Sequence, residues 1–157
     1  MHQAAYEWVA QHAVGARRVL DIGGRNINGT VRPLFPNAEY VTVDLHGGPG
    51  VDVVGDVCNF WPRAKFDVTV CCEVLEHAEN WRGILAAAHR LTRKGGMLIV
   101  TAAGPGREPH SGIDGGRLRG GEHYENITPE ALAAALADWD EVEADTTGED
   151  VRAVAVR

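Results

Sequence analysis

The sequence predicts an α/β fold in which helices cover both faces of a doubly wound, mostly parallel sheet. Short runs rich in valine, isoleucine and leucine alternate with amphipathic segments, and the chain ends in an apolar–polar alternation around a turn. Strands that alternate with helices form parallel sheets, because each helical crossover returns the chain to the same end of the sheet. A length of 157 residues is typical of one domain, so we expect a single domain over residues 1–157.

Four apolar runs predict the strands of the parallel part, with helical stretches between them. The strands are expected at 18–22, 39–44, 66–72 and 96–102. The helices that the apolar spacing predicts most clearly lie at 3–14, within an N-terminal helical segment 1–16, and at 79–91 and 129–138. In the last of these, Thr128 is the expected N-cap and Pro129 takes the first helical position.

The C-terminal region has a different pattern. The stretch "WDEVEADTTGEDVRAVAVR" alternates apolar and polar residues on either side of a Thr-Gly-Glu-Asp turn, which predicts a hairpin with its last strand at 151–156. That strand would be antiparallel at the edge of a mostly parallel sheet. Before it, residues 103–127 hold seven glycines and few apolar residues, and a loop of that length is usually functional.

Composition and charge narrow the class of protein. The chain is 45% apolar, as globular domains are, and its net charge of −7 weighs against a surface for duplex nucleic acid. We find no signal-peptide pattern and no run approaching the roughly 20 apolar residues of a membrane span. Cys58, Cys71 and Cys72 suggest free thiols, so we expect a cytoplasmic protein.

The stretch "RRVLDIGGRNINGT" at 17–30 predicts a buried strand that opens into a glycine loop. A phosphate-binding P-loop would need a lysine after Gly29, and Thr30 stands there instead. A dinucleotide loop needs G-x-G-x-x-G, which the spacing of Gly23, Gly24 and Gly29 does not match. Both of these nucleotide classes are therefore disfavoured.

S-adenosylmethionine fits the carboxylates around this loop. Asp21 ends the first strand, where glycines allow the main chain to approach a ligand closely. Asp44 ends the next strand 23 positions later and is placed to bind a ribose diol with both oxygens. Asp56, in "VVGDVC", is placed to accept a hydrogen bond from an adenine amino group. Each aspartate alone has an ordinary explanation as a cap or turn residue, and it is their joint spacing that favours this cofactor.

With these motifs the chain resembles class I S-adenosylmethionine-dependent methyltransferases over about residues 17–157. "VLDIGG", "YVTVD", "GDV", "FDVTVCCEVLEHAENW" and "LTRKGGMLIVT" look like successive motifs of that family. The family usually shows G-x-G-x-G after the first acid, whereas Asn26 and Asn28 stand in this loop. The resemblance implies a Rossmann-like sheet of seven strands and an enzyme that uses S-adenosylmethionine. The cofactor-binding residues would be Asp21, Gly23, Gly24, Asp44, Leu45, Asp56, Val57 and Glu73.

Methyl transfer from a sulfonium needs positioning more than it needs a catalytic group, and the sequence shows no unambiguous catalytic residue. The candidates are His77, His110, His123 and Tyr124. We expect no metal. As an alternative, Glu73, Glu76, His77 and His123 resemble the ligand set of small-RNA 2′-O-methyltransferases, which hold Mg²⁺ or Mn²⁺.

The expected acceptor is a small or exposed polar molecule, and the loop 103–127 is its expected lid. Arg107, Arg117 and Arg119 in this loop contrast with the acidic chain and suggest an anionic acceptor. The alternatives are the metal-assisted RNA enzyme and a non-catalytic domain that binds a cofactor or a partner. The identity of the acceptor and the oligomeric state are left open.

Overall fold

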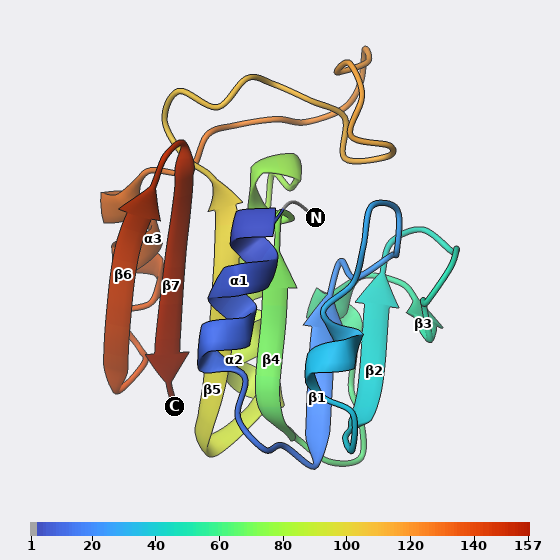
Figure 1. The fold of residues 1–157 in the computed structure, drawn as a ribbon, viewed down its shortest axis with the longest axis vertical. Helices are drawn as coiled ribbons and strands as arrows, with labels where there is room; N and C mark the ends of the chain where they lie inside the picture. Colours follow the sequence, from blue (N-terminus) through green and yellow to red (C-terminus); the bar gives the residue numbers. More distant parts are fainter. Residues whose placement is uncertain (1–2) are drawn as a thin grey trace.

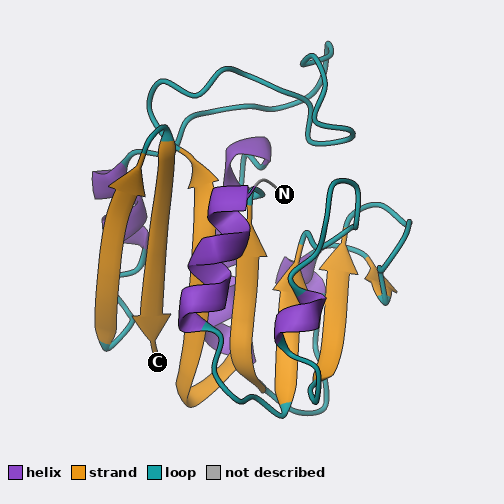
Figure 2. Cartoon of the chain, in the orientation of Figure 1, coloured by secondary structure: helices purple, strands orange, loops and turns teal. Residues whose placement is uncertain are grey.

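A computed structural model describes residues 3–157 and contains one mixed sheet of seven strands (Figures 1 and 2). The strands lie in the order β3-β2-β1-β4-β5-β7-β6. Their bounds, in chain order, are β1 Arg18–Ile22, β2 Glu39–Asp44, β3 Val53–Val54, β4 Phe66–Cys72, β5 Thr92–Ala103, β6 Glu141–Thr147 and β7 Asp150–Val156. Only β7 is antiparallel to its neighbours, which confirms the predicted C-terminal hairpin and its antiparallel strand.

Helices cover both faces of this sheet. Helix α1 (Gln3–His12) packs on one face through Trp8 and Val9. Helices α2 (Trp81–Leu91) and α3 (Pro129–Ala135) pack on the other, as Figure 1 shows. Among residues 3–157, no helix is long and apolar enough to cross a membrane.

Successive side chains of β4 pack into the apolar cores on opposite faces of the sheet. Val68 and Val70 pack in the core under α1, whereas Cys71 packs in the core under α2 and α3. Successive side chains of a strand point to opposite faces, so a strand buried on both sides reads as a continuous apolar run. The three cysteines are free thiols, as expected.

The expectation of helical stretches between all the strands is wrong in the first half of the chain. Only the short 3-10 turn η1 (Arg32–Leu34) lies between β1 and β2, and only β3 and the 3-10 turn η2 (Val57–Asn59) lie between β2 and β4. Pro33 lies inside the η1 turn and Pro36 follows it, which leaves too short a segment for a regular helix. Val31 and Phe35 cover this part of the sheet instead. Strand β5 also begins four residues before the predicted position.

The parallel strands β2, β1, β4 and β5 all end at the same edge of the sheet. Strand β1 pairs with β2 on one side and with β4 on the other, so the strand order reverses beside it. In open α/β sheets, ligands bind outside the carboxyl ends of the strands at such a reversal. In Figure 1 the loop 103–127 runs across above this edge.

The N-cap of α3 gives a direct test of local folding. The Thr128 hydroxyl accepts a hydrogen bond from the amide of Ala131 at 3.2 Å, and Pro129 follows as predicted. We expect Thr128→Ala to lower the free energy of unfolding by about 1 kcal/mol, because it leaves a helix amide without its partner. Urea denaturation measures this loss. Thr128→Ser keeps the hydroxyl and should keep most of the stability, and equal losses in both variants would contradict the capping role.

Candidate functional site

Two adjoining cavities of about 590 and 610 Å³ lie at the carboxyl edge of the strands. Six residues line both of them, so the two form one continuous cleft. These residues are Gly23, Asp44, His46, Glu73, His77 and Gly112. The first five lie at or after the ends of β1, β2 and β4, and Gly112 belongs to the loop 103–127, which runs above this edge in Figure 1.

The glycine loop after β1 is shaped by two close approaches. Gly23 has a φ of 69°, and a Cβ there would lie 2.3 Å from Cγ2 of Val74. A Cβ on Gly24 would lie 2.1 Å from a carboxylate oxygen of Asp21. Both positions therefore require glycine, since any side chain would collide with a neighbour that the fold has already fixed.

Asp21 is buried beneath this loop. Its carboxylate accepts a hydrogen bond of 2.7 Å from the hydroxyl of Tyr40 on β2. Burial raises the pKa of Asp21 to about 7, although the bond from Tyr40 and the charge of Arg32 act in the opposite direction. Burial and the neighbouring Asp21 carboxylate raise the pKa of Tyr40 far above its usual value, so the phenol remains the donor. Asp21 therefore fixes the floor of the cleft rather than projecting into it as an exposed charge.

Two further aspartates are oriented by main-chain amides. The carboxylate of Asp44 accepts from the amide of His46 at 2.8 Å and from that of Arg25 at 3.3 Å, one at each oxygen. Asp56 caps η2 by accepting from the amide of Cys58 at 2.8 Å. Leu45, which follows Asp44, is 66% exposed although it is apolar, and it lines the cleft beside Asp56. An apolar surface beside fixed acceptors suits a flat heteroaromatic ring.

Glu73 has the only positive φ among the non-glycine residues 3–157, at 57°. Its amide donates to the carbonyl of Thr101 on β5 at 2.9 Å, and its carboxylate accepts from the Thr101 hydroxyl at 2.8 Å. Left-handed backbone in a residue other than glycine costs of order 1 kcal/mol or more, and such residues cluster at functional sites. This strained residue lies at the junction of the two cavities.

Beyond Glu73, the 3-10 turn η3 (Leu75–His77) forms a wall of buried titratable groups. Glu76 is fully buried, and burial together with the charge of Glu73 raises its pKa to about 8. The amides of Glu76 and Ala103 partly offset this rise, but no hydrogen bond of normal geometry reaches either carboxylate oxygen. Burial and the neighbouring His110 lower the pKa of His77 to about 4. His77 is therefore a neutral imidazole at neutral pH.

The loop 103–127 is held at its base and organised within itself. The amide of Ile127 donates to the carbonyl of Ala103 at 2.8 Å, and the amide of Glu125 donates to the carbonyl of Glu76 at 2.9 Å. Farther out, the Ser111 hydroxyl donates to Glu122 at 2.7 Å. The Arg25 guanidinium also donates to the carbonyl of Ile113 at 2.9 Å, which ties the glycine loop to this segment.

Two of the three arginines of this loop are engaged within the chain. Arg107 pairs with Asp150 at 2.6 Å and lies 3.9 Å from Glu73, and Arg119 pairs with Asp114. These ion pairs give Arg107 and Arg119 a structural role. They leave less positive charge for an anionic acceptor than the sequence suggested.

Comparisons with known proteins agree with this geometry. Residues 30–100 match the family described as "Methyltransferase domain". Ubiquinone biosynthesis O-methyltransferases from Pseudomonas aeruginosa strain UCBPP-PA14 and from Erwinia tasmaniensis are 27% and 26% identical over 111 and 113 residues. Each match covers 60% of this chain but 48% and 46% of the relative, so the chain spans about half the length of these curated relatives.

Solved structures share the fold across nearly the whole chain. The structure titled "DhpI-SAH complex structure" has a TM-score of 0.69 at 17% identity, covering 97% of this chain and 81% of the other. The 1,6-didemethyltoxoflavin-N1-methyltransferase of Burkholderia thailandensis has a TM-score of 0.67 at 19% identity, covering 98% and 76%. Residues 30–100 thus match a methyltransferase family, and the fold is that of enzymes solved with S-adenosylhomocysteine.

The cleft contains all eight residues that the sequence assigned to cofactor binding. The cavities are lined by Asp21, Gly23, Gly24, Asp44, Leu45, Asp56, Val57 and Glu73. The catalytic candidates His77, His110 and His123 also line the cleft, and the ring of Tyr124 packs edge-on against both His77 and His110. Glu76 lines neither cavity.

The potential metal ligands differ from the set that the sequence suggested. Within residues 3–157, the group whose ligand atoms come together is Glu76, His77 and His110, and neither Glu73 nor His123 belongs to it. Sequence reasoning also missed His46 and Arg25 as residues of the cleft. The position of His46, two residues after Asp44, was a signal that could have identified it, whereas nothing local connects Arg25 to Ile113.

The raised pKa of Asp21 predicts a distinctive pH dependence of stability. The carboxyl is neutral in the folded protein up to about pH 7 but ionises near its ordinary value of 3.8 in the unfolded chain. Ionisation therefore favours unfolding as pH rises between these values. We expect Asp21→Asn, which keeps an acceptor for Tyr40, to gain stability relative to the parent from about pH 4 to 7 and to level off above.

Urea denaturation at several pH values between about 5 and 8 measures this difference. Asp67→Asn is the matched control, because hydrogen bonds from Arg93 and from the amides of Arg17 and Arg18 lower the pKa of Asp67. Its effect on stability should be constant across this range. A constant difference for Asp21→Asn as well would contradict the raised pKa.

Proposed function

We propose that this chain binds S-adenosylmethionine in the cleft and transfers its methyl group to a small polar acceptor. The observation that carries the proposal is the position of Asp44, whose amide-oriented carboxylate lies where the two cavities meet. A ribose at this junction would leave one cavity for the adenine and the other for the amino acid end and the acceptor. The residues present fit each part of the cofactor.

On this proposal, Asp44 binds the ribose diol, and Leu45, Asp56 and Val57 hold the adenine. Main-chain amides orient both carboxylate oxygens of Asp44. Leu45 offers an exposed apolar side chain, and Asp56 caps the turn that begins at Val57, at one end of the cleft. Gly23 and Gly24 allow the main chain to approach the amino acid end, and Glu73 supplies negative charge near its ammonium group.

The cofactor supplies an activated methyl group on a sulfonium. An in-line transfer would leave S-adenosylhomocysteine, and the acceptor atom would lose any proton it carried. The chain's own contribution is to orient the two partners and exclude water. His77, a neutral imidazole on the wall of both cavities, would lie beside the acceptor.

A small acceptor is supported by the names of the relatives, which include ubiquinone biosynthesis O-methyltransferases and a didemethyltoxoflavin N-methyltransferase. Nothing in these comparisons supports the RNA 2′-O-methyltransferase alternative. The cavity beside Glu73 and Arg107 is bounded by polar groups of Glu108, His110 and Ser111, which suits a molecule with hydroxyl or amine groups.

Removing the Asp44 carboxylate tests the assignment of the cofactor site. We expect Asp44→Ala to weaken binding of S-adenosylmethionine and S-adenosylhomocysteine by about 1.5–3 kcal/mol, the range for hydrogen bonds to a charged group. Titration calorimetry measures the change. Asp140→Ala, an exposed aspartate just before β6, is the matched control and should bind like the parent. Unchanged affinity in Asp44→Ala would refute the site.

The loop 103–127 is proposed as the lid of this cleft. Residues 110–113 line the cavities and are tied to the glycine loop through Arg25, so a bound cofactor would add contacts to both segments. We expect amide hydrogen exchange in residues 108–121 to slow when S-adenosylhomocysteine binds, whereas β6 remains unaffected. If exchange in this loop is the same with and without the ligand, the lid assignment fails.

A further inference from the structure

Buried polar atoms without partners gather around His77, at and beneath one wall of the cleft. Within residues 3–157, eight buried side-chain nitrogen or oxygen atoms have no hydrogen-bond partner, and five of them belong to Glu76, His77, His123 and Tyr124. Leaving a buried polar atom unpaired costs of order 1–3 kcal/mol. Such a concentration in one place indicates a ligand that supplies the missing interactions.

The chemistry of these atoms favours a cation. Both oxygens of Glu76 and Nδ1 of His77 are among them. In its ionised form, which a bound cation stabilises, the Glu76 carboxylate accepts through both oxygens and donates through neither, and the imidazole carries a lone pair on one nitrogen. Most of these unpartnered atoms therefore offer electron pairs. A metal ion accepts such pairs better than a neutral hydrogen-bonding molecule does.

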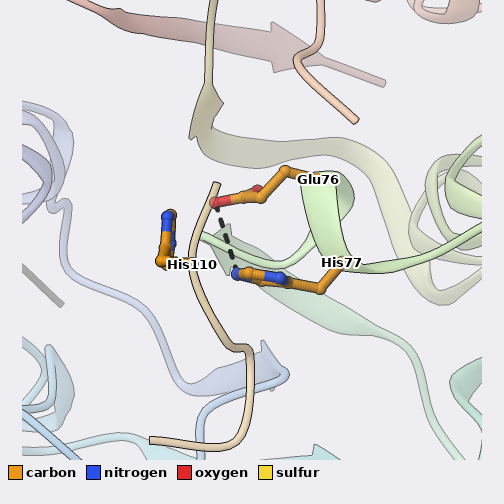
Figure 3. A group of neighbouring side chains, drawn as sticks. All are labelled: Glu76, His77 and His110. Carbon is orange, nitrogen blue, oxygen red and sulfur yellow. Dashed lines mark ion pairs between the residues drawn. The ribbon is translucent and has the colours of Figure 1, made fainter. Parts of the chain in front are cut away.

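The geometry brings a third ligand to this pair from a distant part of the chain. The ligand atoms of Glu76, His77 and His110 all lie within 4.8 Å of one another. Nε2 of His77 is 3.9 Å from Oε1 of Glu76, and the His77 and His110 rings are 4.9 Å apart, edge to face. Figure 3 shows Glu76 and His77 extending from the η3 turn toward the space beside His110.

The ring of His110 is already oriented as metal-ligating histidines are. Its Nδ1 lies 3.1 Å from the carbonyl oxygen of Glu108. A carbonyl only accepts, so Nδ1 carries the proton of this hydrogen bond and Nε2 is left with its lone pair. In metal sites, the ring nitrogen that does not bind the ion commonly donates to a backbone carbonyl, and this bond fixes the tautomer and orientation of the histidine.

We propose that Glu76, His77 and His110 bind one divalent transition-metal ion, with Zn²⁺ as the best match. Two imidazoles and one carboxylate form the three-ligand set that zinc uses where a coordination position stays open, and imidazole disfavours the hard ions Mg²⁺ and Ca²⁺. The site is not the four-residue set that the sequence resemblance suggested, because His110 takes the place of Glu73 and His123.

This site lies where the acceptor is expected, since His77 lines both cavities and His110 lines the one that contains Arg107. An open coordination position would bind an oxygen or nitrogen of the acceptor and hold it beside the cofactor. That role rests on the proposed function. Binding of the ion itself does not, so the two can fail separately.

The experiment titrates the metal-stripped full chain with Zn²⁺, without cofactor, and measures affinity and stoichiometry by competition with a chelating dye. We expect one ion per chain in the parent. Glu76→Gln and His110→Ala should each weaken binding at least about tenfold, because each removes a direct ligand. His89→Ala, a histidine of α2 beside Trp139, is the matched control and should bind like the parent.

Two further measurements keep the result decisive. Glu76→Gln keeps the shape of the side chain and removes a buried ionisable group, so its fold, followed by circular dichroism, should persist. Co²⁺ should give visible absorption typical of imidazole ligation in the parent and lose it in His110→Ala. The assignment is overturned if His123→Ala loses the ion while His110→Ala keeps it. Zn²⁺ binding that is weak, of variable stoichiometry and equal in all variants would also overturn it.

Discussion

Parallel pairing of β1 with both β2 and β4 is the constraint on which the rest of this molecule depends. Because these strands run in one direction, their carboxyl ends meet at one edge, and the chain must leave β1 and β2 by loops at that edge. Asp21, Asp44 and Glu73 stand at or just after those ends. The cleft is therefore a consequence of strand direction, and the loops only adjust its shape.

This arrangement concentrates unfavourable interactions in the cleft. Asp21 and Glu76 are carboxyl groups held away from water, and burial raises the pKa of both. Glu73 adopts a backbone conformation that favours glycine. Elsewhere the two apolar cores on either face of the sheet supply the stability that offsets these costs. Backbone strain and buried carboxyl groups at one edge are typical of a binding site rather than of a stabilising core.

The loop 103–127 links the cleft to the C-terminal hairpin. Arg107 bridges Asp150 at the start of β7 and the region of Glu73, while the amide of Gly104 donates to the carbonyl of Glu149 at 2.7 Å. Through these contacts the antiparallel strand fixes where the loop leaves the sheet. His110 and Gly112 are then carried over the ends of β1 and β4, where they contact His77.

The sequence by itself determined strands β1, β2 and β4, the hairpin and the residues at the strand ends, but it did not indicate β3. Strands β1, β2 and β4 follow their apolar runs, because burial on both faces leaves little freedom in composition. Asp44 was recognisable because it directly ends such a run. The absence of a regular helix after β1 was not recognisable, because periodicity in a short segment does not distinguish a 3-10 turn from a helix.

Only the tertiary structure decided which distant side chains meet. His110 lies 33 positions beyond His77, and no local pattern brings them together. Their contact depends on how a glycine-rich loop is held by Ile127 at its base and Arg25 at its tip. The burial that raises the pKa of Asp21 likewise depends on Tyr40, which its strand brings beside β1. Spacing along the chain specifies local structure, whereas ligand geometry and electrostatics depend on packing between segments that the sequence separates.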